Sequence, residues 1–386
     1  MAAGRQVSLD VGAPRLAAVP PPPAPRTAAA GARGAETLAA VEDLLAQRLD
    51  RLAREWHRGT ATADVVLRED DVPELLARLT LGRGKRLRPL LCHWGWVAAG
   101  GPGADGSGAV VRIGAALELL HVFALVQDDV MDRSATRRGS PSLHVVAQER
   151  HRAAAGHDDP VRYGDSIAVL AGDLGHAEAD ALVAGLPDAV RQLWWRTCVE
   201  LVRGQVRDLS GAATSRSGVS LPRAWEVARA KSGAYTVQRP LELGATVAGA
   251  SAEAMELLGA YGVALGDAFA LRDDLLGVWG RPELTGKPVF DDLRSGKATV
   301  LLALADQRLT GTARRSLARV RGQVHDEADV DVLQQAMVDQ GVCAEVESLI
   351  ERRAAEALDA LDPRVLTREG VEGLAEVTTQ VAWRSS

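Results

Sequence analysis

Apolar residues recur along most of this chain at intervals of three and four positions. In the first such stretch, Leu38, Leu45, Leu49 and Trp56 fall on one face of an amphipathic helix. The same periodicity predicts further helices at Leu87–Ala99, Ile113–Val126, Ser166–Gly185, Ala189–Leu209, Ala252–Val278, Thr299–Leu304, Ala313–Val324, Val330–Gln340 and Ala344–Ala360. Sustained alternation of apolar and polar residues, which would indicate strands, is nearly absent.

These helices are expected to form one domain. Several are apolar on almost all sides, which is typical of central helices in a large bundle. Segments 100–108 and 154–164 hold the Gly, Pro and Asp expected of loops. We therefore predict an all-α fold, a single large helical bundle over residues 35–386. Residues 1–34 are rich in Ala, Pro and Gly and are predicted to be a disordered tail, because they bury too little apolar surface to fold.

Composition and charge exclude some classes of function. A net charge of −6 argues against a general nucleic-acid binder. The cysteines, Cys92, Cys198 and Cys343, form neither a metal-ligand spacing nor a disulfide framework, so a cytoplasmic location is expected. The longest apolar run, Ile113–Val126, is short for a bilayer span and contains Glu118, so no membrane span is expected.

The densest chemical signal is an acidic segment at the end of that apolar run. Asp128 and Asp132 are four residues apart and therefore stack on one face of a helix, with Asp129 beside them. Their mutual repulsion, and their place at a helix C-terminus, are unfavourable. A Mg²⁺ ion would relieve both, because it prefers oxygen ligands and bridges carboxylates to phosphates. The alternative is a solvated acidic helix end.

Arginines follow this segment at once. Arg133, Arg137 and Arg138 come within six residues of Asp132. Arginines beside paired aspartates are typical of a site for a metal-bound polyphosphate, which they contact in a bidentate manner. The alternative is ion pairing within one helix, which contributes little.

A second acidic segment lies in the long apolar helix near the middle of the C-terminal half. Asp267, Asp273 and Asp274 are surrounded there by apolar residues. An adjacent acidic pair in such a helix is costly unless it is paired or bound to metal. We expect it to form the opposite wall of the same metal cluster.

Basic residues occur in three further places. Lys85 and Arg88 follow two glycines at a helix start, where they are expected to share a face and to hold a diphosphate. Lys231 precedes Ser232, and Lys287 and Lys297 flank a later acidic pair. Any one of these lysines alone would be interpreted as a surface residue.

His121 lies seven residues before Asp128, on the same face of the helix. A lone histidine at such a position is usually a satisfied core residue. Its alignment with the acidic residues favours, as an alternative, a polar lining of the same cavity.

Taken in order, these motifs resemble those of trans-isoprenyl diphosphate synthases of the polyprenyl synthetase family, most of all bacterial geranylgeranyl diphosphate synthases. The resemblance covers about Leu79 to Thr310. It implies an isoprenoid-synthase fold with a deep central cavity, a homodimer, and three Mg²⁺ ions per active site. The implied reaction condenses isopentenyl diphosphate with an allylic diphosphate into a longer trans-prenyl diphosphate, and the released diphosphate takes the proton.

The resemblance also implies roles for individual residues. Isopentenyl diphosphate would be held by Lys85, Arg88, His121 and Arg138. Mg²⁺ would be bound by Asp128, Asp132 and Asp273, supported by Asp129 and Asp274. The allylic diphosphate would contact Arg137, Lys231, Lys287 and Lys297, with Ser232, Gln205 and Asp208 close to Lys231. The catalytic group would then be Asp128, Asp129, Asp132, Arg137, Lys231 and Asp273.

Two residues depart from the family pattern, and a further pair of neighbouring residues bears on the length of the product. Gly277 stands where a third aspartate is usual, and Ala270 where a glutamine is usual, so weaker allylic binding or altered activity is expected. Phe123, followed by the small Ala124, lies about 7.5 Å before Asp128 along the helix axis. In relatives this pattern tends to give a twenty-carbon product, geranylgeranyl diphosphate. The alternative is that Phe123 is an ordinary core residue.

Two other functions compete with this interpretation. The first is a terpene cyclase, or an unusual prenyltransferase, on the same scaffold. A cyclase needs no isopentenyl site, so the intact basic residues argue against it. The second is a weakly active regulatory subunit of a heteromeric synthase, which the incomplete second acidic segment permits.

Overall fold

The part of the chain that the structure describes folds almost entirely into helices. The computed structural model describes residues 28–58, 64–68, 70–82, 84–101, 103–137, 139–214, 220–280, 299–321 and 327–384. The helices are α1 (Ala28–Trp56), α2 (Val72–Leu81), α3 (Leu87–Ala98), α4 (Gly103–Met131), α5 (Leu143–Ala153), α6 (Pro160–Val183), α7 (Asp188–Thr214), α8 (Leu221–Ala228), the π-helix η2 (Arg229–Gln238), α9 (Arg239–Ala248), α10 (Ala252–Trp279), α13 (Val300–Arg308), α14 (Gly311–Arg321), α15 (Glu327–Asp339), α16 (Val342–Asp359) and α17 (Arg368–Ala382). A short antiparallel pair, β1 (Thr136–Arg137) and β2 (Ser140–Pro141), interrupts them.

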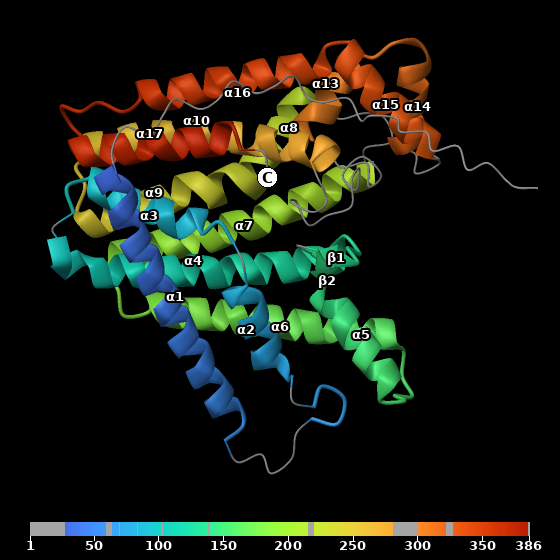
Figure 1. Cartoon of the computed structure of the whole chain (residues 1–386), viewed down its shortest axis with the longest axis horizontal. Helices are drawn as coiled ribbons and strands as arrows, with labels where there is room; N and C mark the ends of the chain where they lie inside the picture. The colour runs from blue at the N-terminus through green and yellow to red at the C-terminus, as the bar shows by residue number, and fades with distance from the viewer. Residues whose placement is uncertain are drawn as a thin grey trace, which may run out of the picture.

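The long helices lie in stacked layers. Figure 1 shows α10, α16 and α17 on one side, α9 and α7 next to them, and then α4 and α6. The closest neighbours are α4 with α6, α3 with α9, and α10 with η2 and α16. Helix α1 runs obliquely across this stack and contacts α2, α3 and α4. The predicted all-α fold is confirmed.

The buried apolar side chains form two clusters that meet along α3. Leu91 and Trp94 belong to the cluster around α10 and the C-terminal helices, whereas Cys92 and Trp96 belong to the cluster around α4 and α6. Because α3 is buried on both of these faces, it joins the halves of the bundle. This double burial agrees with its almost uniformly apolar sequence.

Glycines allow α3 and α9 to approach closely. A side chain on Gly95 would collide with the carbonyl of Leu241, and one on Gly244 would collide with the carbonyl of Cys92. Both contacts are backbone to backbone, so no side-chain movement could relieve them. The absence of side chains at these glycines therefore allows the backbones of α3 and α9 to pack directly against each other at this crossing.

Some helix boundaries differ from those that the sequence predicts. Helix α6 begins at Pro160, inside the expected loop 154–164, where Asp159 caps it by accepting a hydrogen bond from the backbone of Val161 (2.9 Å). Proline and aspartate serve both loops and helix starts, so the pattern was ambiguous. Similarly, α4 begins at Gly103, inside the expected loop 100–108, and α1 begins at Ala28, before the expected start at Ala35. Residues 1–27 lie outside the described part of the chain.

Two helices are long and apolar enough, by length and composition, to cross a membrane. They span Gly108–Met131 and Ala252–Trp279. The first extends well beyond the run Ile113–Val126 from which no span was predicted. Of their most apolar windows, 61% and 67% are buried inside the bundle, as is usual for core helices of a globular protein.

Candidate active site

The first acidic segment lies at the C-terminal end of α4. Asp128 and Asp129 occupy its last turn, and the backbone of Asp132 still donates a helical hydrogen bond to the carbonyl of Asp128 (2.8 Å). Asp129 is buried, with 4% of its surface exposed. This end of the helix is therefore closed off from solvent on one side, so the alternative of a solvated acidic end is wrong for Asp129.

A tight hairpin brings Arg137 back against these acids. The chain turns at Arg133 and Gly139, which both have positive φ angles, and the hydroxyl of Ser142 donates to the carbonyl of Ser134 (2.5 Å) to close the hairpin. The Nε atom of Arg137 donates to Asp129 Oδ1 at 2.8 Å. Arg137 reaches from β1, so the alternative of pairing within one helix is wrong.

The charge of Arg137 is held firmly in place by this arrangement. Its side chain is 12% exposed, and its Nη2 atom lies 3.7 Å from Asp128 Oδ2. Burial opposes the charged form, but the hydrogen bond to Asp129 and the charges of Asp128 and Asp132 outweigh it and raise the pKa of Arg137. A permanently charged guanidinium therefore lies beside the acidic segment.

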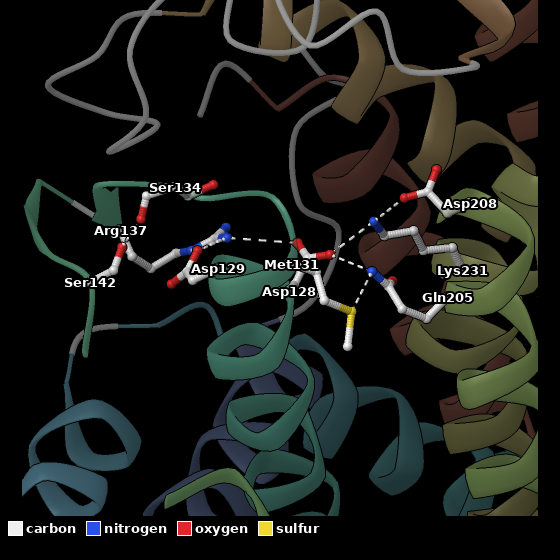
Figure 2. A network of polar contacts seen from close by, with 9 residues as sticks. All are labelled: Asp128, Asp129, Met131, Ser134, Arg137, Ser142, Gln205, Asp208 and Lys231. Carbon is white, nitrogen blue, oxygen red and sulfur yellow. Dashed lines mark hydrogen bonds and ion pairs between the residues drawn. The ribbon is translucent and has the colours of Figure 1, made fainter. Parts of the chain in front are cut away.

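A second group of polar residues meets Asp128 from the other side. Lys231 of η2 lies 3.0 Å from Asp128 Oδ1 and 2.5 Å from Asp208 of α7. Gln205, also on α7, donates to the same oxygen of Asp128 at 3.0 Å and approaches the sulfur of Met131 at 3.5 Å. Figure 2 shows Asp128 between Arg137 on one side and Lys231 and Gln205 on the other. The three segments that the sequence placed in one site are thus brought together.

The position of Lys231 depends on a π-helix held between two α-helices. A side chain on Gly204 would lie 2.8 Å from the carbonyl of Ala230, and a Cβ atom on Gly233 or on Gly266 would lie only 3.0–3.1 Å from the backbone of the other glycine. The first contact joins η2 to α7, next to Gln205, and the second joins it to α10. π-Helical turns are rare and frequently mark functional sites. The periodicity of the sequence did not reveal this one.

The second acidic segment is only partly as expected. Asp273 is half-exposed and forms an ion pair with Arg384, whose guanidinium lies 4.3 Å above the ring of Phe269. Asp274 Oδ2 accepts a hydrogen bond from the backbone of Leu301 at the start of α13 (3.3 Å). Asp273 is therefore available to a ligand that displaces Arg384, whereas Asp274 supports the neighbouring helix.

Asp267 has a structural role instead. Its carboxylate is buried and accepts hydrogen bonds from Nε and Nη2 of Arg229, at 2.8 and 2.7 Å. Arg353 of α16 lies 3.3 Å from it as well. Asp267 lies outside the adjacent pair Asp273 and Asp274 that was expected to form the opposite wall of the metal cluster, and arginines already neutralise its carboxylate.

The glycine-containing segment before α3 is organised around Arg86. This residue has a positive φ of 49° and is buried, and it donates to Glu118 of α4 at 2.6 Å and to the carbonyl of Thr80 at 2.9 Å. Glu118, the charge inside the apolar run of α4, is thereby paired. Arg86 is thus the residue that fixes this segment.

Lys85 lies in the segment before α3, whereas Arg88 lies inside that helix. Helix α3 begins only at Leu87, so the prediction that Lys85 and Arg88 share a helix face is wrong. Lys85 is exposed, yet it is desolvated enough by its surroundings to have a lowered pKa, a shift that Arg384 reinforces and Asp273 opposes. Lys85 therefore lies near the second acidic segment.

Arg88 and His121 meet at an aromatic residue of η2. Arg88 is buried, donates to the hydroxyl of Thr236 at 2.9 Å, and places its guanidinium 4.4 Å above the ring of Tyr235. The ring of His121 lies 6.2 Å from the same tyrosine. Two of the four residues expected to contact isopentenyl diphosphate are thus close together. Tyr235 and Arg384 are neighbours of the site that no sequence motif indicated.

The remaining predicted residues are placed as follows. Ser232 is half-buried in η2 beside Lys231. Phe123 stacks on His176 of α6, with ring centroids 4.8 Å apart, and the half-buried Ala124 follows it. Arg138, Lys287 and Lys297 lie outside the described residues.

The residues at the end of α4 suit a magnesium-bound diphosphate. The side chains there offer carboxylate oxygens, which Mg²⁺ prefers, and they are flanked by Arg137 and Lys231, which suit phosphate oxygens. The model of the family described as polyprenyl synthetase matches residues 70–339. The chain belongs to the polyprenyl synthetase family. It is therefore a trans-prenyltransferase that elongates prenyl chains.

Relatives within this family make products of different lengths. The chain is 33% identical over 287 residues to the geranylfarnesyl diphosphate synthase of Aeropyrum pernix, a match that covers 72% of this chain and 83% of the relative. It is 38% identical over 229 residues to a (2E,6E)-farnesyl diphosphate synthase of Mycobacterium bovis, a match that covers 56% of this chain and 55% of the relative. Family membership therefore determines the type of reaction but leaves the product length open.

A solved structure of the family contains the expected ligands. The geranylgeranyl pyrophosphate synthase of Corynebacterium glutamicum, complexed with isoprenyl diphosphate and magnesium, superposes with a TM-score of 0.82. It is 35% identical and covers 90% of this chain and 99% of its own. The isoprenoid-synthase fold that the resemblance implied is confirmed.

Proposed function

We propose that this protein condenses isopentenyl diphosphate with an allylic diphosphate to give geranylgeranyl diphosphate. The observation that carries the proposal is the convergence on Asp128. Lys231 and Gln205 contact one oxygen of this carboxylate and Arg137 lies near the other, and they come from three different elements. Such a group of fixed charges suits a substrate that is itself a metal-bound diphosphate.

Magnesium fits the carboxylates of this site. Asp128 in the last turn of α4, Asp132 just after that helix, and Asp273 on α10 would hold three ions, which when bound would neutralise the charge of the departing diphosphate. Asp129 would support them by keeping Arg137 in place. Asp273 would join them once Arg384 has moved away from it.

Separate groups of residues would bind the two diphosphates. Arg137 and Lys231, with Lys287 and Lys297, would hold the allylic diphosphate and stabilise its negative charge as it departs. Lys85, Arg88, His121 and Arg138 would hold isopentenyl diphosphate. The coupled product loses a proton, which passes to the released diphosphate. Apolar walls beside α4 would keep water away from the reacting carbons.

The product length follows from Phe123. Its ring faces α6, where it stacks on His176 and where a Cβ atom on Gly172 would be in van der Waals contact with it, at 3.5 Å. A growing chain that runs along α4 from Asp128 would meet this ring. Phe123 therefore supports a twenty-carbon limit.

We also propose that the enzyme is a cytoplasmic homodimer. Five exposed apolar residues lie on α7 at alternating spacings of four and three, which places them along one stripe: Trp195, Val199, Val202, Val206 and Leu209. They are between 40% and 65% exposed. A stripe of this kind on a monomer is typical of an interaction surface. Free thiols at Cys92, Cys198 and Cys343 agree with a reducing compartment.

One assay tests the proposed reaction and its competitors. Purified protein is incubated with Mg²⁺, isopentenyl diphosphate and, in turn, dimethylallyl, geranyl and farnesyl diphosphate. A linear twenty-carbon diphosphate is the expected product. Release of hydrocarbon without isopentenyl diphosphate would instead identify a cyclase, and no turnover with any primer would favour the regulatory subunit.

The variant Asp128→Ala connects this activity to the site. It should lower kcat by about 10³-fold, because a metal ligand contributes several kcal/mol to the transition state. The matched control is Asp188→Ala, an exposed aspartate at the start of α7 that pairs with Arg191, which should retain activity. Near-normal turnover by Asp128→Ala would refute the assignment of the metal site.

A further inference from the structure

A second group of potential metal ligands lies between α6 and α7, away from the acidic end of α4. One nitrogen of His176, one oxygen of Asp180 and the sulfur of Cys198 all lie within 4.8 Å of one another. His176 and Asp180 are four residues apart, so they share a face of α6, and Cys198 approaches from α7. The sequence did not reveal the group, because Cys198 is distant in the chain from the other two.

The imidazole of His176 is poised for a partner that the described residues do not provide. Its Nε2 atom is shielded from solvent and has no hydrogen-bond partner among them, and the nearest carboxylate oxygen, on Asp180, is 4.0 Å away. A buried polar atom left without a partner is destabilising. A bound ion at this nitrogen would satisfy it.

Asp180 is already oriented toward this position. Its Oδ1 atom accepts a hydrogen bond from the indole of Trp194, which is 4% exposed, at 2.7 Å. Hydrogen bonds from neighbouring groups commonly orient the ligands of protein metal sites. The side chain of Asp180 is 55% exposed, which gives an ion a path from solvent. A tetrahedral ion requires ligand atoms about 3.3–3.8 Å apart, so a bound ion would hold these three atoms closer together than the 4.8 Å within which they lie here.

The chemistry of the three ligands selects the ion. A thiolate and an imidazole suit zinc, whereas magnesium and calcium prefer oxygen ligands alone. We propose that His176, Asp180 and Cys198 form a binding site for Zn²⁺, with the fourth position left to water. This zinc site shares no residue with the proposed magnesium site of Asp128 and Asp273, whose ligands are all carboxylates.

The proposed zinc site contacts Phe123, the residue that is proposed to limit product length. The His176 ring stacks on Phe123 with an angle of 19° between the ring planes. Zinc at Nε2 would fix the orientation of the imidazole and so restrict the movement of Phe123. Insofar as Phe123 limits product length, a consequence that rests on the proposed function, zinc should narrow the range of products.

Cobalt provides a test that does not depend on activity. Metal-free full-length protein is titrated with Co²⁺, whose bond to a thiolate gives a charge-transfer absorption in the near ultraviolet. We expect this band in the wild-type protein, its loss when Zn²⁺ is added, and its loss in Cys198→Ser. The absence of the band in the wild-type protein, or its persistence in Cys198→Ser, would overturn the proposal.

Control variants separate this site from other thiols and from the magnesium site. Cys343→Ser, at a buried cysteine of α16, should keep the band, and so should Asp128→Ala, because neither residue belongs to the group. Asp180→Asn, at the more exposed ligand, should weaken Co²⁺ binding without unfolding the protein, which thermal melting of each variant checks. Equal affinity in Asp180→Asn and the wild-type protein would contradict the assigned ligand set. Because these readouts need no substrate, they stand even if the proposed prenyl transfer fails.

Discussion

The carboxylate of Asp128 receives contacts from elements that lie far apart in the sequence. Lys231 and Gln205 approach one of its oxygens, and Arg137 lies near the other. Each of these groups also suits a phosphate oxygen. A diphosphate that enters with its metal ions would therefore exchange contacts with residues that are already in position, and little reorganisation is needed.

At this residue scale, Phe123→Ala should lengthen the product. Removing the ring opens the space between α4 and His176, so a chain could extend further before it meets a wall. The free energy of unfolding should fall by less than the ~3–5 kcal/mol that is typical of truncating a fully buried phenylalanine, because Phe123 is only half-buried. Product analysis by chromatography measures the length. The control is Val122→Ala, in the core one residue away, and a wild-type product from Phe123→Ala would refute the role of the ring.

Arg384 is expected to compete with magnesium for Asp273. Its guanidinium pairs with this carboxylate and stacks on Phe269. Arg384→Gln should lower the Mg²⁺ concentration for half-maximal activity by up to about fivefold, because a partly exposed ion pair contributes at most about 1 kcal/mol. Arg384→Lys, which keeps the charge, should behave like the wild-type protein. An unchanged magnesium dependence in the glutamine variant would show that the pair does not compete.

At the scale of elements, the site depends on η2 and the two helices that hold it. Gly204 places α7 against the backbone of Ala230, and Gly233 places η2 against Gly266 of α10. These contacts fix the position and orientation of η2, and with it of Lys231, relative to Asp128 on α4. The residues with the chemistry and the residues that position them are thus different, and only the former carry a recognisable motif.

Gly204→Ala should therefore impair the enzyme although it leaves every charged residue intact. The added methyl group would lie 2.8 Å from the Ala230 carbonyl, and such overpacking costs about 1–3 kcal/mol. We expect a lower melting temperature and a lower kcat, since Lys231 must shift. The matched control is Gly108→Ala in α4, where the new methyl group meets nothing within 4 Å and should stabilise the protein by about 0.5–1 kcal/mol. Equal behaviour of the two variants would argue against the role of Gly204.

At the scale of the whole molecule, two apolar clusters share α3, and the site lies where elements of both meet. Asp128 belongs to α4 in one half, and Asp273 belongs to α10 in the other. The stripe on α7 lies on the same helix as Gln205 and Asp208. Contact with a second copy through this stripe would therefore steady the helix that supports Lys231.

Val202→Glu tests this surface. It introduces a charge at the centre of the α7 stripe, where Val202 is 53% exposed, and should convert a dimer into a monomer because burying an unpaired charge is costly. Sedimentation or light scattering measures the mass. Val332→Glu, at an equally apolar position 40% exposed on α15, should remain dimeric. A wild-type protein that is already monomeric would exclude the proposed dimer.

The sequence predicted most of the long helices and the acidic and basic segments of the site for a physical reason, whereas Gln205 and Asp208 were placed beside Lys231 only by the family resemblance. Long apolar helices and closely spaced charges leave local patterns that periodicity and spacing detect. Short helices such as α2, α8 and α9 leave weaker patterns. The neutralisation of Asp267 by Arg229, and of Asp273 by Arg384, depends on contacts between distant segments, and no spacing in the chain encodes them.

The π-helical winding of η2 has a consequence for insertions and deletions. Lys231 near its start faces Asp128, and Tyr235 one turn later faces Arg88 and His121. Removing one residue between them would rotate everything that follows about the helix axis, so Tyr235 would turn away while Lys231 stayed in place. The spacing between Lys231 and Tyr235 is thus set by the number of residues that η2 places between them, so this segment should accept many substitutions more readily than a change in its length.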